Sequence, residues 1–529
     1  MMIHRRRLLQ AAGAAATLAA PRIARSQDKK VLRFVPYVDL AILDPMINTA
    51  AQTRTHGYMV FDTLYAQDAD YRAQPEMVAG HQIDDDFKLW TLTLRDGLRF
   101  HDGSPVLARD VVASLKRWGA ADPAGRALFA VVAEITAPSD KVVRLRMKQP
   151  YRLLPDVLGK IAPSMACIMP ERLADTPATK ALTEMVGSGP FRFVAAERVS
   201  GSKVVYERFE GYVPRPGGSA PGLTSGPKLV NVDRVEWITM PEPATAAAAL
   251  QAGEVDWWEV PSSDLLPLLR QRRNLATEVK DKTGVLPILR FNSLQAPFDN
   301  PAIRRAVLSA TRQSEFMEAF SSERSEWHDH VGLFTPGTPM ATTAGLDRFA
   351  AAPDIAAAKK AIEAAGYKGE RVVVMQPTDH PVNNAMSQVG ADLFKRIGLN
   401  VDLQAMDAGT MFQRRANREG VDKGGWSAFP SMVGGADALN PAVSFLTRGN
   451  GADAWYGWPT IPALETERSA WFEAPDLEAQ QTLCSQMQLT VLNDPPHIQL
   501  GQILQPTSYR TDITGVLDGF PKFWNVQKT

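Results

Sequence analysis

The 529-residue chain has little cysteine and no long apolar run after its N-terminal region. Cys167 and Cys484 are its two cysteines, too few for the disulfide framework of a small secreted protein. They form either one disulfide or two buried free thiols. Because no later segment approaches about eighteen consecutive apolar residues, we expect no membrane-spanning helix in the body of the chain.

The sequence also lacks the common catalytic motifs. It has no Gly-x-x-x-x-Gly-Lys-Ser/Thr phosphate loop, no Gly-x-Ser-x-Gly elbow and no His-Glu-x-x-His zinc helix. Ser188 lies between glycines, but Pro190 removes the backbone donor that an elbow would use, so we interpret the segment as a turn. His328-Asp329-His330 is interpreted as a solvated loop. The sequence therefore predicts no catalytic residue, no metal and no cofactor.

Neither sign of charge dominates the chain. The 58 basic residues balance 58 acidic ones, and removal of residues 1–26 would take away five arginines, leaving 53 basic residues and a net charge of −5. A surface of this kind attracts neither nucleic acid nor an anionic membrane. We expect neither as a partner.

The N-terminal segment indicates where the protein works. An arginine run at 5–7 precedes two leucines and the uncharged, alanine-rich stretch 11–20, which is the arrangement of a twin-arginine export signal. Its apolar part is too short to cross a bilayer. Small residues predict cleavage between Ser26 and Gln27, and therefore a periplasmic mature protein. A basic arm on a cytosolic protein is the alternative, but such an arm requires no alanine run.

The remaining chain of about 503 residues is longer than one hydrophobic core usually supports, so we expect two or more lobes. Apolar and polar residues alternate over 90–94, Asp96-Gly97 supplies a turn, and the alternation resumes over 98–100. This pattern predicts a half-buried hairpin.

The second half of the chain has a different pattern. Residues 372–375, 383–397 and 399–403 have strand, helix and strand character in succession, which predicts a βαβ unit in an open α/β sheet. Asn300 is placed to cap a helix that continues through Phe320.

Tryptophan and tyrosine residues cluster near turns in two parts of the chain. They are Trp257-Trp258, Trp426, Trp455-Tyr456 and Trp458. Rings beside loops can line a binding cleft, although aromatic residues also dominate cores. From the first group we take Trp258 as a candidate ligand contact.

Residues 94–105 and 109–115 closely resemble the signature of the family 5 extracellular solute-binding proteins, which serve peptide, nickel and related ABC importers. Further segments match the family in the same order. They are 43–45, 187–191, 250–256, 291–292, 299–306 and 364–367. The resemblance thus covers nearly the whole chain after the signal.

The resemblance implies an α/β fold, a bilobed periplasmic binding protein with two crossover strands between its lobes. In this arrangement residues 27–286 form the large lobe, which contains an additional subdomain at about 70–185. Residues 287–500 form the α/β second lobe, and residues 501–529 return to the large lobe.

We place the two crossovers near Gly284–Phe291 and His497–Gln505, where strand-like stretches leave one lobe and enter the other. Asn292 is the hinge candidate, because an amide beside a crossing strand can hold backbone groups in both open and closed forms.

The family relationship further implies a receptor that captures a small solute, peptide-like or another organic metabolite, by hinge closure. We expect it to be a monomer that delivers the solute unchanged to the permease and ATPase subunits of an ABC importer. The alternative is a secreted hydrolase that uses His101 and Asp102, but no nucleophile is paired with them in the sequence.

Candidate ligand contacts in the second half follow from the family's Gly-Trp segment, whose backbone and ring border the ligand. Gly425, Trp426 and Ser427 match it, whereas Phe429 stands where peptide binders usually carry an aspartate that pairs the peptide's amino group. We therefore do not expect a free peptide N-terminus to bind in the usual manner. Asp437 is either a substitute carboxylate or a surface aspartate in a glycine turn.

Further candidate contacts come from loops in both halves. Asp39 and Leu40 lie at the spacing where family members contact ligand from the large lobe, and Tyr37 is close by. Asp379 and His380 follow a predicted strand on the side where α/β sheets bind ligands. For each of these residues, a loop or capping role is the alternative.

Overall fold

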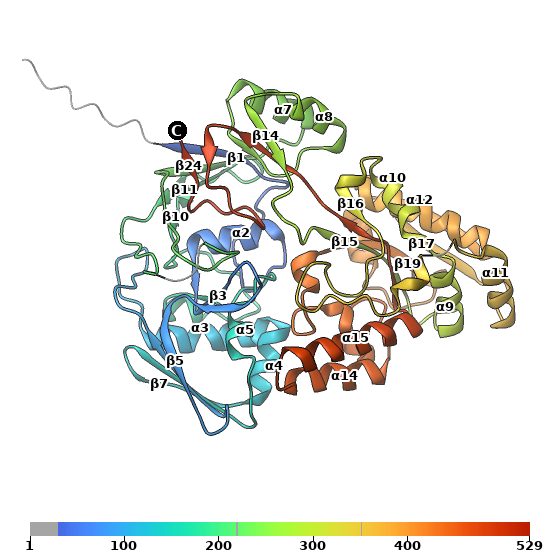
Figure 1. Cartoon of the computed structure of the whole chain (residues 1–529), viewed down its shortest axis with the longest axis horizontal. Helices are drawn as coiled ribbons and strands as arrows, with labels where there is room; N and C mark the ends of the chain where they lie inside the picture. Colours follow the sequence, from blue (N-terminus) through green and yellow to red (C-terminus); the bar gives the residue numbers. More distant parts are fainter. Residues whose placement is uncertain (1–29, 218–220, 351) are drawn as a thin grey trace, which may run out of the picture.

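The computed structural model describes residues 30–217, 221–350 and 352–529. The predicted export signal and its cleavage site lie outside these residues. Two lobes lie side by side (Figure 1), each built around a seven-stranded sheet. The chain forms the large lobe first, continues into the second lobe, and returns at its C-terminal end beside β1 (Val31–Val35).

The large-lobe sheet joins segments that are far apart in the sequence. Its strand order is β10 (Phe191–Phe193), β11 (Lys203–Arg208), β12 (Arg234–Ile238), β1, β13 (Trp257–Trp258), β22 (Thr507–Arg510) and β14 (Leu275–Glu278). Strand β1 is parallel to both β12 and β13, whereas β22 is antiparallel to β13 and β14. The C-terminal segment is thereby fixed in the large lobe.

The second-lobe sheet has β15 near its centre. Its order is β16 (Trp327–His328), β21 (Gln502–Ile503), β15 (Val285–Phe291), β19 (Ala428–Gly434), β17 (Arg371–Pro377) and β18 (Asn400–Met406), and β20 (His497–Gln499) also pairs with β15. Strands β17 and β18 are parallel and flank α12 (Pro381–Arg396) in sequence. The βαβ prediction is confirmed.

Local sequence explains where α12 begins and ends. The His380 side chain accepts a hydrogen bond from the backbone N–H of Asn383, and Pro381 occupies the first turn, where its missing N–H costs nothing. Gly398 follows the helix with a φ of 91°, a conformation that favours glycine. Before the helix, the buried β-branched run 372–374 forms the core of β17.

A separate sheet lies within the large lobe, where the additional subdomain was predicted. It has the order β5 (Val78–Asp84), β6 (Leu89–Leu94), β8 (Val142–Met147) and β7 (Val132–Ser139). The hairpin predicted across Asp96-Gly97 is wrong, because β6 pairs with β5 and β8. Residues 98–100 instead lie between two turns, with Leu98 and Phe100 buried and Arg99 in an isolated antiparallel bridge to Pro105.

The remaining strands form two-stranded pairs: β2 (Asp62–Thr63) with β9 (Cys167–Ile168), β3 (Tyr65–Gln67) with β4 (Ala73–Pro75), and β23 (Ile513–Thr514) with β24 (Gln527–Lys528).

Cys167 and Cys484 are buried free thiols, which resolves the alternatives left by the sequence.

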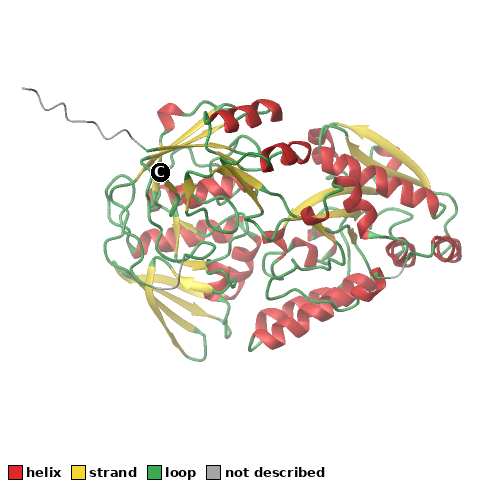
Figure 2. Cartoon of the chain, turned by 45° about the horizontal axis from the view of Figure 1, so that its top comes forward, coloured by secondary structure: helices red, strands yellow, loops and turns green. Residues whose placement is uncertain are grey.

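Helices flank the strands in both lobes (Figure 2). Those of the large lobe are α2 (Ala51–Val60), α3 (Ala108–Ala121), α4 (Pro123–Val131), α5 (Leu154–Leu158), α6 (Glu171–Ala174), α7 (Pro243–Ala252) and α8 (Leu266–Arg270). The second lobe has, besides α12, α9 (Pro301–Ser309), α10 (Gln313–Phe320), α11 (Ile355–Ala364), α13 (Ala408–Arg414), α14 (Pro462–Glu473) and α15 (Leu477–Asn493). Asn300 caps α9 as predicted, but the helix expected to reach Phe320 is divided into α9 and α10.

Two segments connect the lobes. The first, residues 279–284, leads from β14 of the large-lobe sheet to β15 of the second-lobe sheet, and the second, residues 504–506, leads from β21 to β22. The predicted boundaries at 286/287 and 500/501 fall within β15 and between β20 and β21. Both crossings lie at the same edge of the second lobe, because β15 and β21 pair through Val285 and Ile503.

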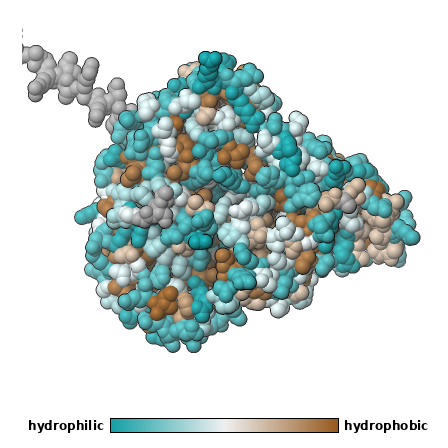
Figure 3. Space-filling model, viewed as in Figure 1, coloured by the Kyte–Doolittle hydropathy of each residue, from teal (hydrophilic) through white to brown (hydrophobic). Residues whose placement is uncertain are grey.

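The surface turned toward the viewer in Figure 3 mixes hydrophilic residues with scattered hydrophobic ones. No helix within the described residues has the length and apolar character needed to cross a membrane.

Candidate ligand cleft between the lobes

A cavity of about 500 Å³ lies where the two lobes meet the crossing segments. Its walls come from the large lobe (37–38, 49–52, 54, 163, 257, 259–260, 507, 519–521), from the crossings and adjoining β15 residue (280–281, 283–285, 505) and from the second lobe (380, 412, 432, 434–437). We call this cavity the cleft. Its size is in the range that holds a small organic ligand.

The large-lobe wall places three functional groups in the cleft. Tyr37 follows β1 and is half-exposed, Arg54 projects from the first turns of α2, and Glu259 follows β13. The backbone N–H of Tyr37 donates to Glu259 Oε2 at 2.7 Å, and Gln52 Nε2 donates to the same oxygen at 3.4 Å. Burial raises the pKa of Glu259. The Glu259 carboxylate is thus already held by its own lobe.

The second-lobe wall is formed where β19 and two helices end at the cleft. His380 is the N-cap of α12, Phe412 lies on α13, and Asp437 lies in the short turn that follows β19. Gly434 leaves room for the Asp437 carboxylate, because a Cβ at 434 would lie 2.9 Å from Asp437 Oδ2. Burial lowers the pKa of His380, so its ring is neutral at pH 7.

Arg54 and Asp437 are the two charged groups of the cleft without a hydrogen-bonding partner. Within the described residues the Arg54 guanidinium makes no hydrogen bond, its buried Nε included, and it lies 4.3 Å over the Phe520 ring. The Asp437 carboxylate accepts no hydrogen bond from any described residue. Burial raises the pKa of Asp437 to about 6, although the positive charges of Arg54 and Lys160 act in the opposite direction.

The N-terminal turn of α2 adds a further feature to the wall that carries Arg54. Residues 49–52 line the cleft, and Ala50 at the N-cap position provides no side-chain cap. The first backbone N–H groups of a helix favour negative charge. This part of the large-lobe wall therefore favours an anionic ligand group, and the second-lobe wall at Asp437 favours a cationic one.

The family's Gly-Trp segment lies in a closed aromatic cluster of the second lobe rather than in the cleft wall. Trp426 and Phe429 are fully buried, with ring centroids 4.8 Å apart, and Trp455 lies 5.6 Å from Phe429. The Ser427 hydroxyl accepts from the backbone of strand β17, and a side chain at Gly425 would collide with the carbonyl oxygen of residue 419. We call these rings the aromatic cluster.

Phe429 lies directly opposite Arg290 in the pairing of β19 with β15. Arg290 is fully buried, donates to the backbone oxygen of Tyr456 at 2.6 Å, and lies 5.3 Å from the Trp455 ring centroid. Burial and the nearby charge of Arg304 lower the pKa of Arg290 to about 9. A cationic ligand group at this position would meet Arg290 without the carboxylate that peptide binders provide.

The other predicted contacts have structural partners outside the cleft wall. The Asp39 carboxylate accepts from the backbone N–H of Gly201, Leu40 is buried, and Trp258 is buried in the core beside α7. Asp379 accepts from the backbone N–H at the start of α13. Of the predicted ligand contacts, Tyr37, His380 and Asp437 line the cleft.

Asn292, the hinge candidate, lies at the end of β15 opposite the crossing. Its side chain donates to the backbone oxygen of Trp426 at 2.9 Å, and its backbone N–H donates to Ser427 O. Both partners belong to the second lobe, so these bonds hold that lobe together.

Sequence reasoning missed Arg54, Glu259 and Phe412 as cleft residues. No motif marks them, since each follows from how distant segments converge at the crossings. The one available signal for Arg54 is its position near the start of a helix that directly follows the matched segment 43–45.

His101 and Asp102, the pair of the hydrolase alternative, are used within the fold. His101 Nε2 lies 3.0 Å from Gly189 O, its ring packs against Phe209, and burial lowers its pKa to about 4. Asp102 accepts hydrogen bonds from Ser104. In the described part of the chain, no group of three or more His, Cys, Asp or Glu residues is arranged to hold a metal ion.

Two lobes, two crossings and a cleft with walls from both lobes define the class of two-lobed solute-binding proteins. Residues 72–454 match the model of the bacterial extracellular solute-binding proteins, family 5. The chain belongs to this family.

Similar proteins agree with this assignment. A probable peptide ABC transporter periplasmic-binding protein of Sinorhizobium fredii is 35% identical over 100% of both chains. A glutathione-binding protein of Pectobacterium atrosepticum is 27% identical over 94% of this chain and 93% of its own length.

Solved structures share the fold. A periplasmic binding protein of A. tumefaciens R10 in complex with agropinic acid has a TM-score of 0.76 at 19% identity and covers 94% of this chain and 99% of its own. A peptide-bound periplasmic binding protein of Helicobacter pylori has the same TM-score at 18% identity, covering 94% and 98%. The predicted bilobed fold class is confirmed.

The protein is therefore a solute-binding protein of an ABC importer, a transport receptor rather than an enzyme. The hydrolase alternative is wrong.

Proposed function

We propose that this protein is a periplasmic receptor for a zwitterionic solute of amino-acid or peptide type. The supporting observation is that Arg54 and Asp437, of opposite charge and each without a hydrogen-bonding partner among the described residues, line one cavity from opposite lobes. A ligand ammonium group pairs with Asp437, and a ligand carboxylate pairs with Arg54 at the start of α2. Names of relatives that refer to peptides and glutathione support a ligand of this chemistry.

The closing motion follows from the same pair. Because the two charged groups belong to different lobes, a ligand that bridges them binds more tightly when the lobes are together, and it shifts the hinge equilibrium toward closure. The crossing segments 279–284 and 504–506 are the proposed hinge.

Export and delivery complete the proposal. A twin-arginine signal in residues 1–26 directs the chain to the periplasm, where it acts as a monomer and hands the solute to the permease and ATPase subunits of an importer. On the face shown in Figure 3, hydrophobic residues are interspersed among hydrophilic ones, as on a surface that no partner covers.

Isothermal titration with matched ligand series tests the proposal. The series contains dipeptides, glutathione and amino-acid conjugates, each beside an N-acetylated and a C-amidated analogue. We expect the zwitterions to bind with compaction seen by small-angle scattering, and each blocked analogue to bind at least tenfold more weakly. Equal affinity for blocked and free forms, or binding without compaction, would contradict the proposal.

A further inference from the structure

The cleft exposes large apolar side chains from both lobes. Tyr37 and Val38, which follow β1, are 49% and 48% exposed, and Phe412 on α13 is 43% exposed. The guanidinium carbon of Arg415 lies 4.9 Å from the centroid of the Phe412 ring, a cation–π contact that holds the ring in place. Exposed apolar groups in a concave surface are typical of a ligand-binding site.

The paired strands β15 and β19 continue this apolar surface. Met432 and Gly434 line the cleft, whereas the intervening Val433 is buried on the other face, as the alternation of a strand requires. Val285, which pairs with Gly434, also lines the cleft. Because Gly434 has no side chain, the surface beside Val285 stays open to a ligand.

The Asp437 carboxylate lies beside this open surface. Its Oδ2 atom is 2.9 Å from the position that a Cβ at residue 434 would occupy. A ligand ammonium paired with Asp437 therefore lies next to Gly434 and Val285, and the side chain on the adjacent ligand carbon is within reach of Met432. A polar side chain would lose water there without gaining hydrogen bonds from these residues, whereas an apolar one would gain by burial.

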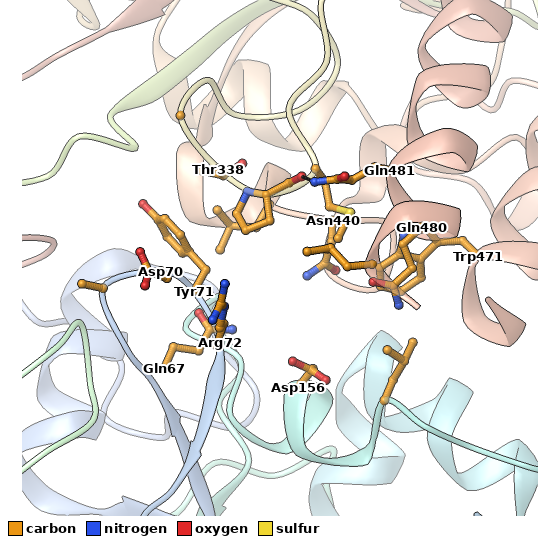
Figure 4. Close-up of a pocket in the computed structure, with 17 residues that line it drawn as sticks. Gln67, Asp70, Tyr71, Arg72, Asp156, Thr338, Asn440, Trp471, Gln480 and Gln481 are labelled. Carbon is orange, nitrogen blue, oxygen red and sulfur yellow. Dashed lines mark hydrogen bonds between the residues drawn. The ribbon is translucent and has the colours of Figure 1, made fainter. Parts of the chain in front are cut away.

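The cleft is not closed at the crossing segments. A cavity of about 420 Å³ shares Lys280, Asp281 and Gly519 with the cleft, and it shares Ala69 and Tyr71 with a cavity of about 550 Å³. Figure 4 shows polar side chains from both lobes around this last cavity: Asp70, Arg72, Asp156, Asn440, Gln480 and Gln481. A longer ligand thus has polar surroundings for its remaining part, so an apolar preference in the cleft concerns the residue that carries the ammonium.

We propose that the cleft selects zwitterions with an apolar side chain on the carbon that carries the ammonium group, and that Phe412 and Met432 determine this specificity. The inference rests on the proposed function, since it takes Asp437 as the partner of the ammonium. On lobe closure, Tyr37 and Val38 cover the ligand side chain from the large lobe.

Isothermal titration of the purified mature protein with dipeptides that differ in one side chain tests the preference. The apolar compounds are leucylglycine and phenylalanylglycine, the polar counterparts are asparaginylglycine and serylglycine, and glycylleucine moves the apolar group away from the ammonium. We expect the tighter apolar compound to bind at least about tenfold more tightly than all three others. A smaller ratio, or binding of neither apolar compound below about 10 mM, would overturn the inference.

N-acetylated leucylglycine separates this inference from the proposed function. If the blocked compound binds as tightly as the free one, the proposed function fails. A requirement for the free ammonium without a side-chain preference overturns the present inference alone.

Two variants locate the specificity. Phe412→Ala should fold like wild type, because the ring is exposed, and should lose at least about fivefold in affinity for the apolar dipeptides but less than about twofold for serylglycine. Met432→Gln, which keeps the length of the side chain and adds a polar end, should narrow the ratio in the same direction. Leu268→Ala, at a 40% exposed position on α8 outside the cleft, is the matched control and should bind both kinds of ligand normally. A loss of equal size for apolar and polar dipeptides, or no loss in either cleft variant, would overturn the assignment.

Discussion

The two ends of strand β19 have different surroundings. At its beginning, Phe429 and the preceding Trp426 fill their own space in the aromatic cluster, beside the buried Arg290. At its end, Gly434 and the following Asp437 open into the cleft. The family pattern marks the first end, whereas the unpartnered charge lies at the second. Under the proposed function, the resemblance transfers the backbone position of the Gly-Trp segment, whereas the group that pairs with the ligand is Asp437.

The largest expected effect is on stability at the first end. Phe429→Ala leaves a cavity in a fully buried aromatic contact and should lower the free energy of unfolding by about 3–5 kcal/mol. Denaturant unfolding measures this change. Phe412→Ala, at a 43% exposed ring of the cleft, is the control and should cost less than about 1 kcal/mol. Similar losses in the two variants would contradict the distinction between the two ends.

The next largest effect is on binding at the second end. Asp437→Asn keeps the shape of the side chain but removes the charge that pairs with the ligand ammonium, so the affinity should fall by about 2–5 kcal/mol. Titration of the tightest zwitterion with both proteins measures the difference. The variant should fold normally, because the Asp437 carboxylate has no hydrogen bond to lose within the described residues. Wild-type affinity in Asp437→Asn would place the ammonium elsewhere.

The pH dependence of ligand affinity tests whether Asp437 is the partner of the ligand ammonium. Since burial raises the pKa of Asp437 to about 6, protonation below that pH removes the partner of the ligand ammonium. Affinity should therefore fall by up to about tenfold per pH unit below 6, until the ligand-bound pKa is reached. The profile should be flat between pH 5 and 7 in Asp437→Asn.

The raised pKa of Asp437 also determines how the stability of the ligand-free protein changes with pH. A carboxyl with a folded pKa above its unfolded value binds more protons when folded, so its contribution to stability declines as pH rises from about 4 to 6. Relative to wild type, Asp437→Asn should gain stability across this window in melting experiments. If Asp437→Asn instead lost stability relative to wild type as the pH rises from about 4 to 6, a cation of the protein would be pairing with Asp437.

The smallest effect is expected for the family's tryptophan. Trp426→Phe removes the hydrogen bond from Nε1 to Arg415 O at 3.2 Å and some ring volume. It should cost about 1–3 kcal/mol of stability, while ligand affinity changes less than about twofold. A loss of affinity above tenfold in a variant that still folds would show that the aromatic cluster is part of the binding site.

Sequence reasoning predicted most of the architecture, because that part depends on local patterns. The β-branched run of β17, the proline after His380 and the glycine at 398 specify strand, helix start and helix end within one segment. The predicted hairpin at Asp96-Gly97 failed because alternation shows that a strand is half-buried but does not identify its partner.

The candidate site was harder to predict, because its residues come from segments that are far apart in the sequence. Arg54, Glu259 and Asp437 are about 200 residues apart in sequence and meet only where the lobes join. Tyr37, His380 and Asp437 could be suggested from loop positions, but whether their groups already had partners depended on the packing. Phe429 was recognised as a departure from the family, but its burial against Trp455 follows from the sheet register.

The structure of the complex with the tightest-binding zwitterion tests the central claim most directly. The account predicts that the ligand fills the cleft, with its ammonium group within about 3 Å of Asp437 and its carboxylate at Arg54. A ligand bound among Trp426, Phe429 and Trp455, with the cleft containing only solvent, would contradict it.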